Sequence, residues 1–248
     1  MVVAALDAPR RRRFGGPRAR RADPAGALVE VTRATVIDVA ELEDAPAADA
    51  WLRHAAGAGA EATVADALTV LNQALHAHRV AAADPFAIEV APAAALVTRV
   101  GYGSGDDVAA GRWTAAREVR PAARATAREH ALRPQERIAA LLSGRDVALA
   151  SELLALRARL DLDHGRTREA ALQLDAALVA ACEELRGWAG LPGMPARLEE
   201  LDEHREPVAA AAAAARTGAL DETGVAAVRA ALGRLEAALR ARTAAASF

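Results

Sequence analysis

Apolar residues in the second half of the chain recur every three or four positions, the spacing that lines one face of an α-helix. The pattern predicts five helices, separated by turns containing glycine or proline, over residues 134–142, 146–162, 168–186, 195–216 and 222–242. Pro207 lies inside the fourth, so we expect a kink there or a helix that begins at that residue. Residues 134–243 are therefore predicted to form an all-α helical bundle.

The last two predicted helices also carry apolar positions that approach a seven-residue repeat. Such repeats favour an antiparallel hairpin and can also pack against the helices of a partner. The repeat positions are Leu198, Leu201, Val208 and Ala212 in the fourth helix and Val225, Val228, Leu232, Leu235 and Leu239 in the fifth.

The first half of the chain mixes the two periods. Residues 28–39 alternate between apolar and polar side chains, and residues 94–100 are mostly apolar, so both segments are predicted strands. Pro46 can open a short helix. A longer helix over residues 61–84 carries a stripe at the spacing of a buried face, formed by Val64, Leu68, Leu71 and Leu75.

The Gly-rich segment after the second strand predicts a short helical turn. Ser104 and Asp107 resemble an N-terminal cap pair for a turn that ends at Gly111, and residues 112–119 then form another strand or begin a helix. The fold class is therefore predicted to be α+β, mostly helical, with a small N-terminal α+β unit over residues 27–119 followed by the bundle.

Two segments lack apolar periodicity. Residues 1–26 contain seven arginines between Arg10 and Arg21 and are predicted to be a disordered arm. Residues 120–133 combine arginine, proline and alanine and are predicted to be a linker. The arginines follow the apolar start of the chain, the reverse of a secretory signal, and no run approaches the roughly twenty bulky apolar residues of a membrane span.

Composition adds few functional indications. All 31 basic residues are Arg, and Asn, Tyr and Phe are scarce, which is typical of GC-rich coding, so the choice of Arg over Lys carries no function. The formal net charge of −2 gives no strong field toward nucleic acid or an anionic membrane. The single cysteine, Cys182, lies in an apolar helical pattern and is expected to be a small buried hydrophobe in a reducing, cytoplasmic setting.

One polar stripe could assemble a site. Asn72, His76 and Arg79 lie at i, i+4 and i+7 of the helix over residues 61–84, so their side chains can converge on an anion or a partner carboxylate, or bond an adjacent strand. With Asp84 and Tyr102 they would form a small enzyme or anion-binding site. This is one alternative hypothesis for the function.

Several recognisable chemistries are excluded by spacing. His76 and His78 point about 200° apart on a helix and cannot bind one metal ion, so no metal is expected. Gly101, Gly103 and Gly105 fit neither a dinucleotide fingerprint nor a phosphate loop, which needs a lysine, and are predicted to form a flexible turn. No cofactor is expected.

The Arg-rich arm carries a second alternative. Its arginines could neutralise the phosphates of RNA or DNA, although Phe14 is the only aromatic residue among them for stacking on bases. The candidate nucleic-acid-binding residues are Arg10, Arg11, Arg12, Arg13, Arg18, Arg20 and Arg21.

Two resemblances add to this picture. The segment over residues 154–185 resembles one tetratricopeptide-type helical hairpin, through Leu154, Ala158, Gly165, Ala170, Leu174 and Ala177, with Asp161 where such a repeat usually has an aromatic residue. A single repeat implies hairpin packing rather than a peptide groove.

The segments LNQALHAHRVAAADPF and RVGYGSGDDVAAGRW resemble an uncharacterised protein family of GC-rich bacteria, a resemblance that implies no activity.

Taken together, the patterns favour a non-catalytic function in protein–protein interaction or assembly. Helices with long apolar stripes and abundant alanine can pack closely against partner helices, and the sequence contains no diagnostic catalytic motif. The expected partner is another protein or a second copy bound through the C-terminal helices, with no membrane association.

Overall fold

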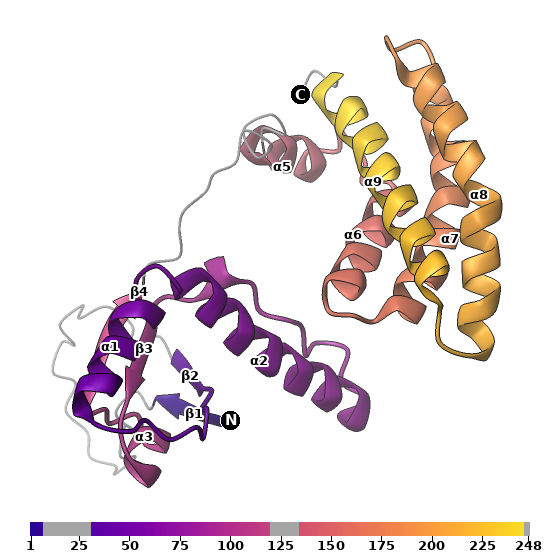
Figure 1. Ribbon diagram of the computed structural model, residues 1–248. Helices are drawn as coiled ribbons and strands as arrows, with labels where there is room; N and C mark the ends of the chain where they lie inside the picture. Colours follow the sequence, from indigo (N-terminus) through magenta and orange to yellow (C-terminus); the bar gives the residue numbers. More distant parts are fainter. Residues whose placement is uncertain (7–30, 120–133, 246–248) are drawn as a thin grey trace, which may run out of the picture. The chain divides into compact units, whose positions relative to one another are not determined.

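A computed structural model describes residues 1–6, 31–119 and 134–245 of the chain. The chain divides into two compact units, Met1–Ala123 and Arg124–Phe248, and the boundary falls within the segment predicted to be a linker. The described residues are mostly helical, with two small antiparallel sheets in the N-terminal unit (Figure 1). The broad class predicted from the sequence is confirmed.

The N-terminal unit combines four short strands with three α-helices in its described part. Strands β1 and β2 pair with Val2 opposite Thr35 and Leu6 opposite Val31, and β3 pairs with β4 with Thr98 opposite Val119. In chain order the elements are β1 (Val2–Leu6), β2 (Val31–Thr35), α1 (Ala45–Ala55), α2 (Ala60–Ala82), the 3-10 turn η1 (Pro92–Ala94), β3 (Thr98–Tyr102), α3 (Gly105–Ala109) and β4 (Ala115–Val119).

Two strand predictions need correction. Residues 2–6 were expected inside a disordered arm but form β1, because β2 offers them a partner strand; Arg10–Arg21 lie outside the described residues. The strand expected over residues 28–39 ends at Thr35. Beyond it Val39 is 90% exposed, so alternation alone did not bring this residue into a sheet.

Helix α1 covers the β3–β4 sheet through a small apolar core. The Asp44 side chain accepts a hydrogen bond from the Ala47 N–H at 2.8 Å and so caps the start of α1. Leu52 and Ala55 then pack against Val100 and Val119. The segment over residues 112–119, predicted as strand or helix, is the strand β4.

Glycine is required inside β3 by close contact between strands. A Cβ atom added at Gly101 would lie 2.6 Å from the Ala115 carbonyl oxygen, nearer than carbon and oxygen can approach. Gly101 therefore belongs to the sheet rather than to the flexible turn predicted for the three glycines.

The two ends of α3 differ in how well they match the prediction. Gly111 ends the α3 turn with φ of +78°, a left-handed conformation that favours glycine. At the other end, Ser104 precedes α3 without the expected side-chain cap bond.

The apolar stripe of α2 is less buried than predicted. Val64 contacts the α1–sheet core, but Leu68, Leu71 and Leu75 are only half-buried. Among the residues of α2, only Asn72 is buried. Pro85 and Asp84 lie beyond the left-handed Ala83 that ends the helix, and the chain that follows runs back along α2.

The described part of the C-terminal unit is helical throughout, and each of the five predicted helices is present (Figure 1). Helix α7 packs against α6, α8 and α9, and the core between them consists almost entirely of leucine, alanine and valine. In chain order the elements are α5 (Pro134–Leu142), α6 (Ala150–Asp163), α7 (Thr167–Glu184), the 3-10 turn η2 (Leu185–Trp188), α8 (Met194–Thr217) and α9 (Glu222–Ala245).

The α8–α9 hairpin confirms the pairing predicted for the last two helices. Helix α8 begins at Met194 and continues through Pro207, so the alternative that it starts at Pro207 is wrong. Leu201 and Val208 of α8, with Leu232 and Leu235 of α9, are fully buried inside the unit. These stripes are therefore not available to a partner, and the predicted dimer through the same stripes lacks its contact surface.

Asp161 closes the turn between α6 and α7. One of its carboxylate oxygens accepts a hydrogen bond from Arg166 Nε at 2.5 Å, and the other accepts one from Gln173 Nε2 at 2.6 Å. Gly165 supplies the left-handed residue of the turn, with φ of +72°. These polar contacts explain why an acid stands where the resemblance to a tetratricopeptide hairpin leads one to expect an aromatic residue.

Candidate functional site

The polar stripe of α2 binds backbone groups of its own unit. The Asn72 side chain donates to the Val90 carbonyl oxygen at 3.1 Å and accepts from the Val90 N–H at 2.8 Å. Arg79 Nε donates to the Ala87 carbonyl oxygen at 2.6 Å. Together they hold the extended chain over residues 87–90 along the helix.

Glu89 lies between the other members of the stripe. Its side chain is only 4% exposed, with one oxygen 3.9 Å from His76 Nδ1 and the other 3.7 Å from Arg79 Nη2. The structure thus brings Asn72, His76 and Arg79 together, as predicted, around a carboxylate and backbone of the same unit. Of the two expectations for this stripe, these contacts support bonding to a neighbouring segment rather than an external anion.

The other two candidate residues make separate contacts. Asp84 accepts a hydrogen bond from the Phe86 N–H at 2.9 Å and shapes the turn after α2. The Tyr102 hydroxyl lies on β3 and donates to Asp49 Oδ1 of α1 at 2.7 Å, a bond that raises the pKa of the phenol. The five residues do not form one catalytic constellation.

Substitution of Asn72 by alanine is expected to release residues 87–90 from α2. The Val90 N–H and carbonyl both lose their partner, at a cost of about 1–3 kcal/mol. Hydrogen–deuterium exchange at the Val90 amide should become about tenfold faster or more, while the matched variant of the exposed neighbour, Gln73→Ala, should leave it unchanged. Equal protection in both variants would contradict the assigned contact.

The described residues offer no group of three or more His, Cys, Asp or Glu side chains able to hold a metal ion. His76 is half-buried beside Glu89, and His78 is exposed. In the same described ranges, every helix is too short or too polar to cross a bilayer.

A cluster of buried ions in the C-terminal unit was not predicted. Arg242, near the end of α9, donates to both carboxylate oxygens of Asp146, at 2.5 and 3.3 Å. Arg137 of α5 reaches the same carboxylate at 3.2 Å and Glu152 of α6 at 2.6 Å. The exposed fractions of the Arg242 and Asp146 side chains are 4% and 6%. The cluster therefore joins α5, α6 and α9 away from solvent.

Neighbouring groups complete this cluster. The Arg242 guanidinium lies 5.0 Å from the centre of the Trp188 ring, within cation–π distance. Glu184 accepts hydrogen bonds from the Ser151 hydroxyl at 2.6 Å and from the Ala150 and Ser151 N–H groups, and so caps the start of α6.

The cluster also shifts the ionisation of Asp146. Burial alone would raise the pKa of this carboxyl, but hydrogen bonds from Arg242, the Val147 N–H and Arg137 outweigh it and lower the pKa below its usual value. A carboxylate held in this way stays ionised and already has its partners. The arrangement fits a structural role, fixing α5 to the bundle, better than proton transfer.

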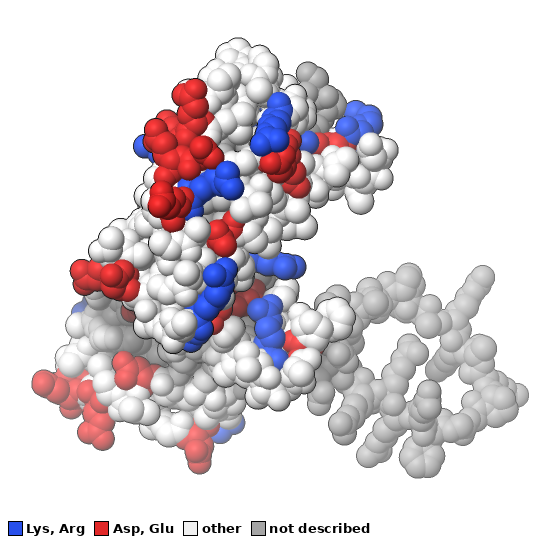
Figure 2. Space-filling view, turned by 90° about the vertical axis from the view of Figure 1, so that its right-hand side faces the viewer, with Lys and Arg blue, Asp and Glu red and all other residues white. Residues whose placement is uncertain are grey.

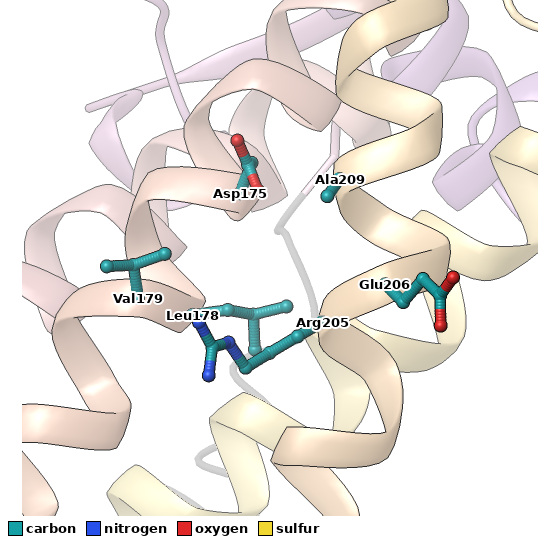
Figure 3. A pocket seen from close by; sticks show the side chains of 6 residues that line it. All are labelled: Asp175, Leu178, Val179, Arg205, Glu206 and Ala209. Atoms are coloured by element: carbon teal, nitrogen blue, oxygen red, sulfur yellow. The ribbon is translucent and has the colours of Figure 1, made fainter.

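An open depression of about 380 Å³ lies between α7 and α8. Leu178 is buried at its base, Val179 is half exposed, and the Arg205 side chain crosses from α8 toward Leu178 (Figure 3). Arg205 pairs with Asp202 at 3.2 Å, and Asp175 lies 3.8 Å from Arg216. Because these charges already have partners, the depression presents no evident ligand chemistry.

Cys182 is half-buried beside this region rather than fully buried as expected. Burial raises the pKa of its thiol. A smaller thiolate fraction makes the residue a poor nucleophile at neutral pH, which supports a packing role.

Large apolar side chains are exposed on α5 and α6, and together they are named here the α5–α6 surface. Its members combine large apolar side chains with high exposure, and Leu142 is 85% exposed. The Arg137–Glu152 ion pair joins the two helices beside it. The surface consists of Ile138 and Leu142 of α5, Val147 of the connection, and Leu153 and Leu156 of α6.

The sequence contains an indication of this surface that the helical periodicity concealed. In α6, Ala155, Ala158 and Leu162 face the core, while Leu153 and Leu156 lie on the outer side. A helix with large apolar residues on two sides has more apolar surface than one bundle core can cover. The excess of leucine could therefore have been interpreted as a second contact face.

Comparison with protein-family models, curated proteins and solved structures finds no match to this chain. The contacts and exposed surfaces of the described residues are therefore the basis for a function.

Proposed function

We propose that the C-terminal helical unit is a non-catalytic protein-interaction module that binds through the α5–α6 surface. The observation that carries this proposal is the exposure of its five large apolar side chains, from 53% for Leu153 to 85% for Leu142. Five exposed large apolar side chains on two consecutive helices favour an interaction site, since exposed apolar residues are otherwise usually scattered singly over a protein surface.

The charge distribution supports the same function. Between Ile138 and Leu156, the only exposed charged residue is Arg145, because Asp146 and Glu152 are turned into the ion cluster. Depletion of charge at the centre of a patch distinguishes interfaces from ordinary surface. The exposed side of α8 differs from the α5–α6 surface in its charge, because acidic side chains gather near one end of this helix (Figure 2).

The ion cluster explains how α5 can present apolar side chains to solvent. Arg137 holds the helix from its inner side through Asp146 and Glu152, and Ala140 is fully buried. Ile138 and Leu142 then point away from these contacts. A helix fixed before binding loses less conformational freedom on association, which favours affinity.

The enzyme alternative receives less support from the same contacts. Asn72 and Arg79 are engaged by residues 87–90, and the buried ions around Arg242 pair with one another. An acid–base site needs a group that can exchange a proton with a substrate in a cleft. The side chains named above are instead held by contacts within their own units, so they support the interaction function better than the enzyme alternative.

Photo-crosslinking tests the interaction function directly. A benzophenone amino acid in place of Leu142 in the full chain should give a product of higher mass in cells. The same probe at Glu203, exposed on α8, serves as the matched control and should not give it. Leu156→Glu in the same chain should remove the Leu142 product. No specific product at Leu142, or one insensitive to Leu156→Glu, contradicts the proposal.

A further inference from the structure

We infer that α5 detaches from the bundle and loses its helix as a unit while α6–α9 stay folded, and that the ion pairs of Arg137 keep the docked state dominant. This inference rests on the proposed function and adds how the α5–α6 surface is regulated. Ile138 and Leu142 belong to that surface only while α5 is docked.

The apolar contacts of α5 with the rest of its unit are few. Ala140 is its one buried residue, Leu141 is half-buried, and the large side chains of Ile138 and Leu142 are exposed. Among the residues that the structure describes, the apolar core of the C-terminal unit includes none from α5. Burial of one alanine removes little apolar area from water and stabilises little. The docking of α5 therefore depends mainly on polar contacts.

Arg137 supplies these polar contacts. Its Nη2 donates to both carboxylate oxygens of Glu152, at 2.6 and 2.7 Å, and its Nε donates to Asp146 at 3.2 Å. The exposed fractions of the Arg137, Asp146 and Glu152 side chains are only 20%, 6% and 12%. Charged hydrogen bonds shielded from water are strong, and their loss has a large effect. One side chain thus provides most of the attachment of α5.

The bundle keeps its own contacts when α5 leaves. Arg242 of α9 donates two hydrogen bonds to Asp146 and lies 3.9 Å from Glu152. Glu152 also accepts a hydrogen bond from the Leu149 N–H at 3.0 Å, at the start of α6. These bonds do not involve Arg137, so α6 retains both its cap and its connection to α9. The opening can therefore stop at the end of α5.

The chain between α5 and Asp146 suits such an opening. Gly144 has φ of +72°, and a Cβ atom added there would contact nothing, so the backbone can change direction at this residue without a clash. Helix α5 has nine residues, fewer than the roughly 12–15 that an isolated helix needs in water. Detachment therefore also unfolds α5.

The docked fraction of α5 sets the affinity of the α5–α6 surface. A partner that requires the docked helix binds more weakly in proportion to the fraction of molecules in which α5 is docked. A bound partner in turn favours the docked state, because it binds that state preferentially. The Arg137 ion pairs are thus positioned to control binding without touching the partner.

Native-state hydrogen–deuterium exchange of the full chain at low, non-denaturing urea concentrations tests the inference. Relative to unfolded peptide, the amides of residues 138–142 should be protected, but at least about a hundredfold less than those of residues 174–178 in α7. Their exchange should hardly change with urea, because a local opening exposes little surface. The inference is overturned if α5 shows no protection, or if both segments exchange with the same urea dependence.

Charge reversal at Arg137 tests the role of its ion pairs. Arg137→Glu places a third carboxylate beside Asp146 and Glu152, so exchange of residues 138–142 should become about a hundredfold faster or more, while residues 174–178 keep their protection. Arg159→Glu is the matched control, because Arg159 pairs with Glu236 at 2.8 Å between α6 and α9. It should leave the exchange of α5 unchanged. Equal acceleration of α5 in both variants, or equal loss of protection in α5 and α7 of Arg137→Glu, overturns the inference.

Photo-crosslinking from Leu142 separates this inference from the proposed function. The product should weaken in Arg137→Glu and persist in Arg159→Glu. If it persists in Arg137→Glu although α5 has lost its protection, the regulation is wrong and the interaction function stands. If the wild-type chain gives no specific product while α5 opens locally, the proposed function is wrong and the opening of α5 stands.

Discussion

Replacing Arg242 with methionine is expected to lower the free energy of unfolding by about 3–5 kcal/mol at neutral pH, the usual cost of removing one partner of a buried ion pair. The Arg242 side chain is 4% exposed and makes two hydrogen bonds to Asp146. Without it, Asp146 and Glu152 share Arg137 alone, so the buried cluster keeps two carboxylates and one guanidinium. Methionine is a shorter, flexible and uncharged apolar side chain, so the substitution removes the guanidinium together with its contact with Trp188.

The destabilisation should shrink as pH falls. In the wild-type chain the pKa of Asp146 is lowered, so its contribution to stability is complete above the usual carboxyl pKa of about 4 and is lost as pH falls below that value. The variant loses the Arg242 hydrogen bond, the largest of the effects that lower the pKa of Asp146, so this pKa is expected to rise. Protonation then relieves the uncompensated charge in mild acid, and the difference between the two proteins narrows from pH 7 to pH about 4.

Urea unfolding followed by circular dichroism at several pH values measures this difference. Arg234→Met is the matched control on the same helix, because Arg234 is 59% exposed and lies 3.6 Å from Glu200. A pair of that kind contributes about 0–1 kcal/mol. If both variants lose the same stability, or if the Arg242 variant has a pH-independent deficit, the cluster does not act as a compensated buried network.

Sequence patterns predicted the helices of the C-terminal unit because helix ends and core faces are local properties. Gly144, Gly165 and Gly193 adopt positive φ at helix boundaries, where glycine is favoured in any context. The stripe containing Val228, Leu232 and Leu235 recurs at helical spacing and is buried. Both kinds of information lie within a few residues of one another along the chain.

The ion cluster could not be predicted in the same way. Asp146 and Arg242 are 96 positions apart in sequence, and each resembles an ordinary surface charge in its own helix or turn. Only the packing of α9 against α6 buries them together. The outward orientation of α5 depends on this cluster, since Arg137 occupies the inner side that an apolar residue would otherwise take.

The apolar stripe of α2 shows what periodicity along the sequence leaves undetermined. Its periodicity predicted a buried stripe that includes Leu68 and Leu71, but both are half-buried. Periodicity indicates which side of a helix is apolar and not how much of the unit covers that side. The convergence of Asn72, His76 and Arg79 on one neighbour was predictable from their spacing. That the neighbour would be residues 87–90 was one of two open alternatives, because it depends on the return path of the chain after Pro85.

Replacing Leu174 with alanine is expected to destabilise the C-terminal unit by about 3–5 kcal/mol. Leu174 is fully buried in α7, the helix that contacts α6, α8 and α9. The core cluster that contains it also includes Ala158, Ala170 and Ala177. Alanine side chains have no rotamers with which to fill a new space, so the cavity stays open unless whole helices move, and a cavity that cannot collapse gives the larger cost in such substitutions.

Leu172→Ala provides the matched control two positions away on the same helix, because Leu172 is 39% exposed. It removes the same atoms from a site that water can reach, so the expected loss is below about 1 kcal/mol. Denaturant unfolding measures both. A similar loss in both variants would mean that burial in α7 does not control the stability of the unit. A small loss for Leu174→Ala with a lower m-value would instead indicate that the helices close on the cavity or that cooperativity is lost, in contradiction to a rigid alanine–leucine core.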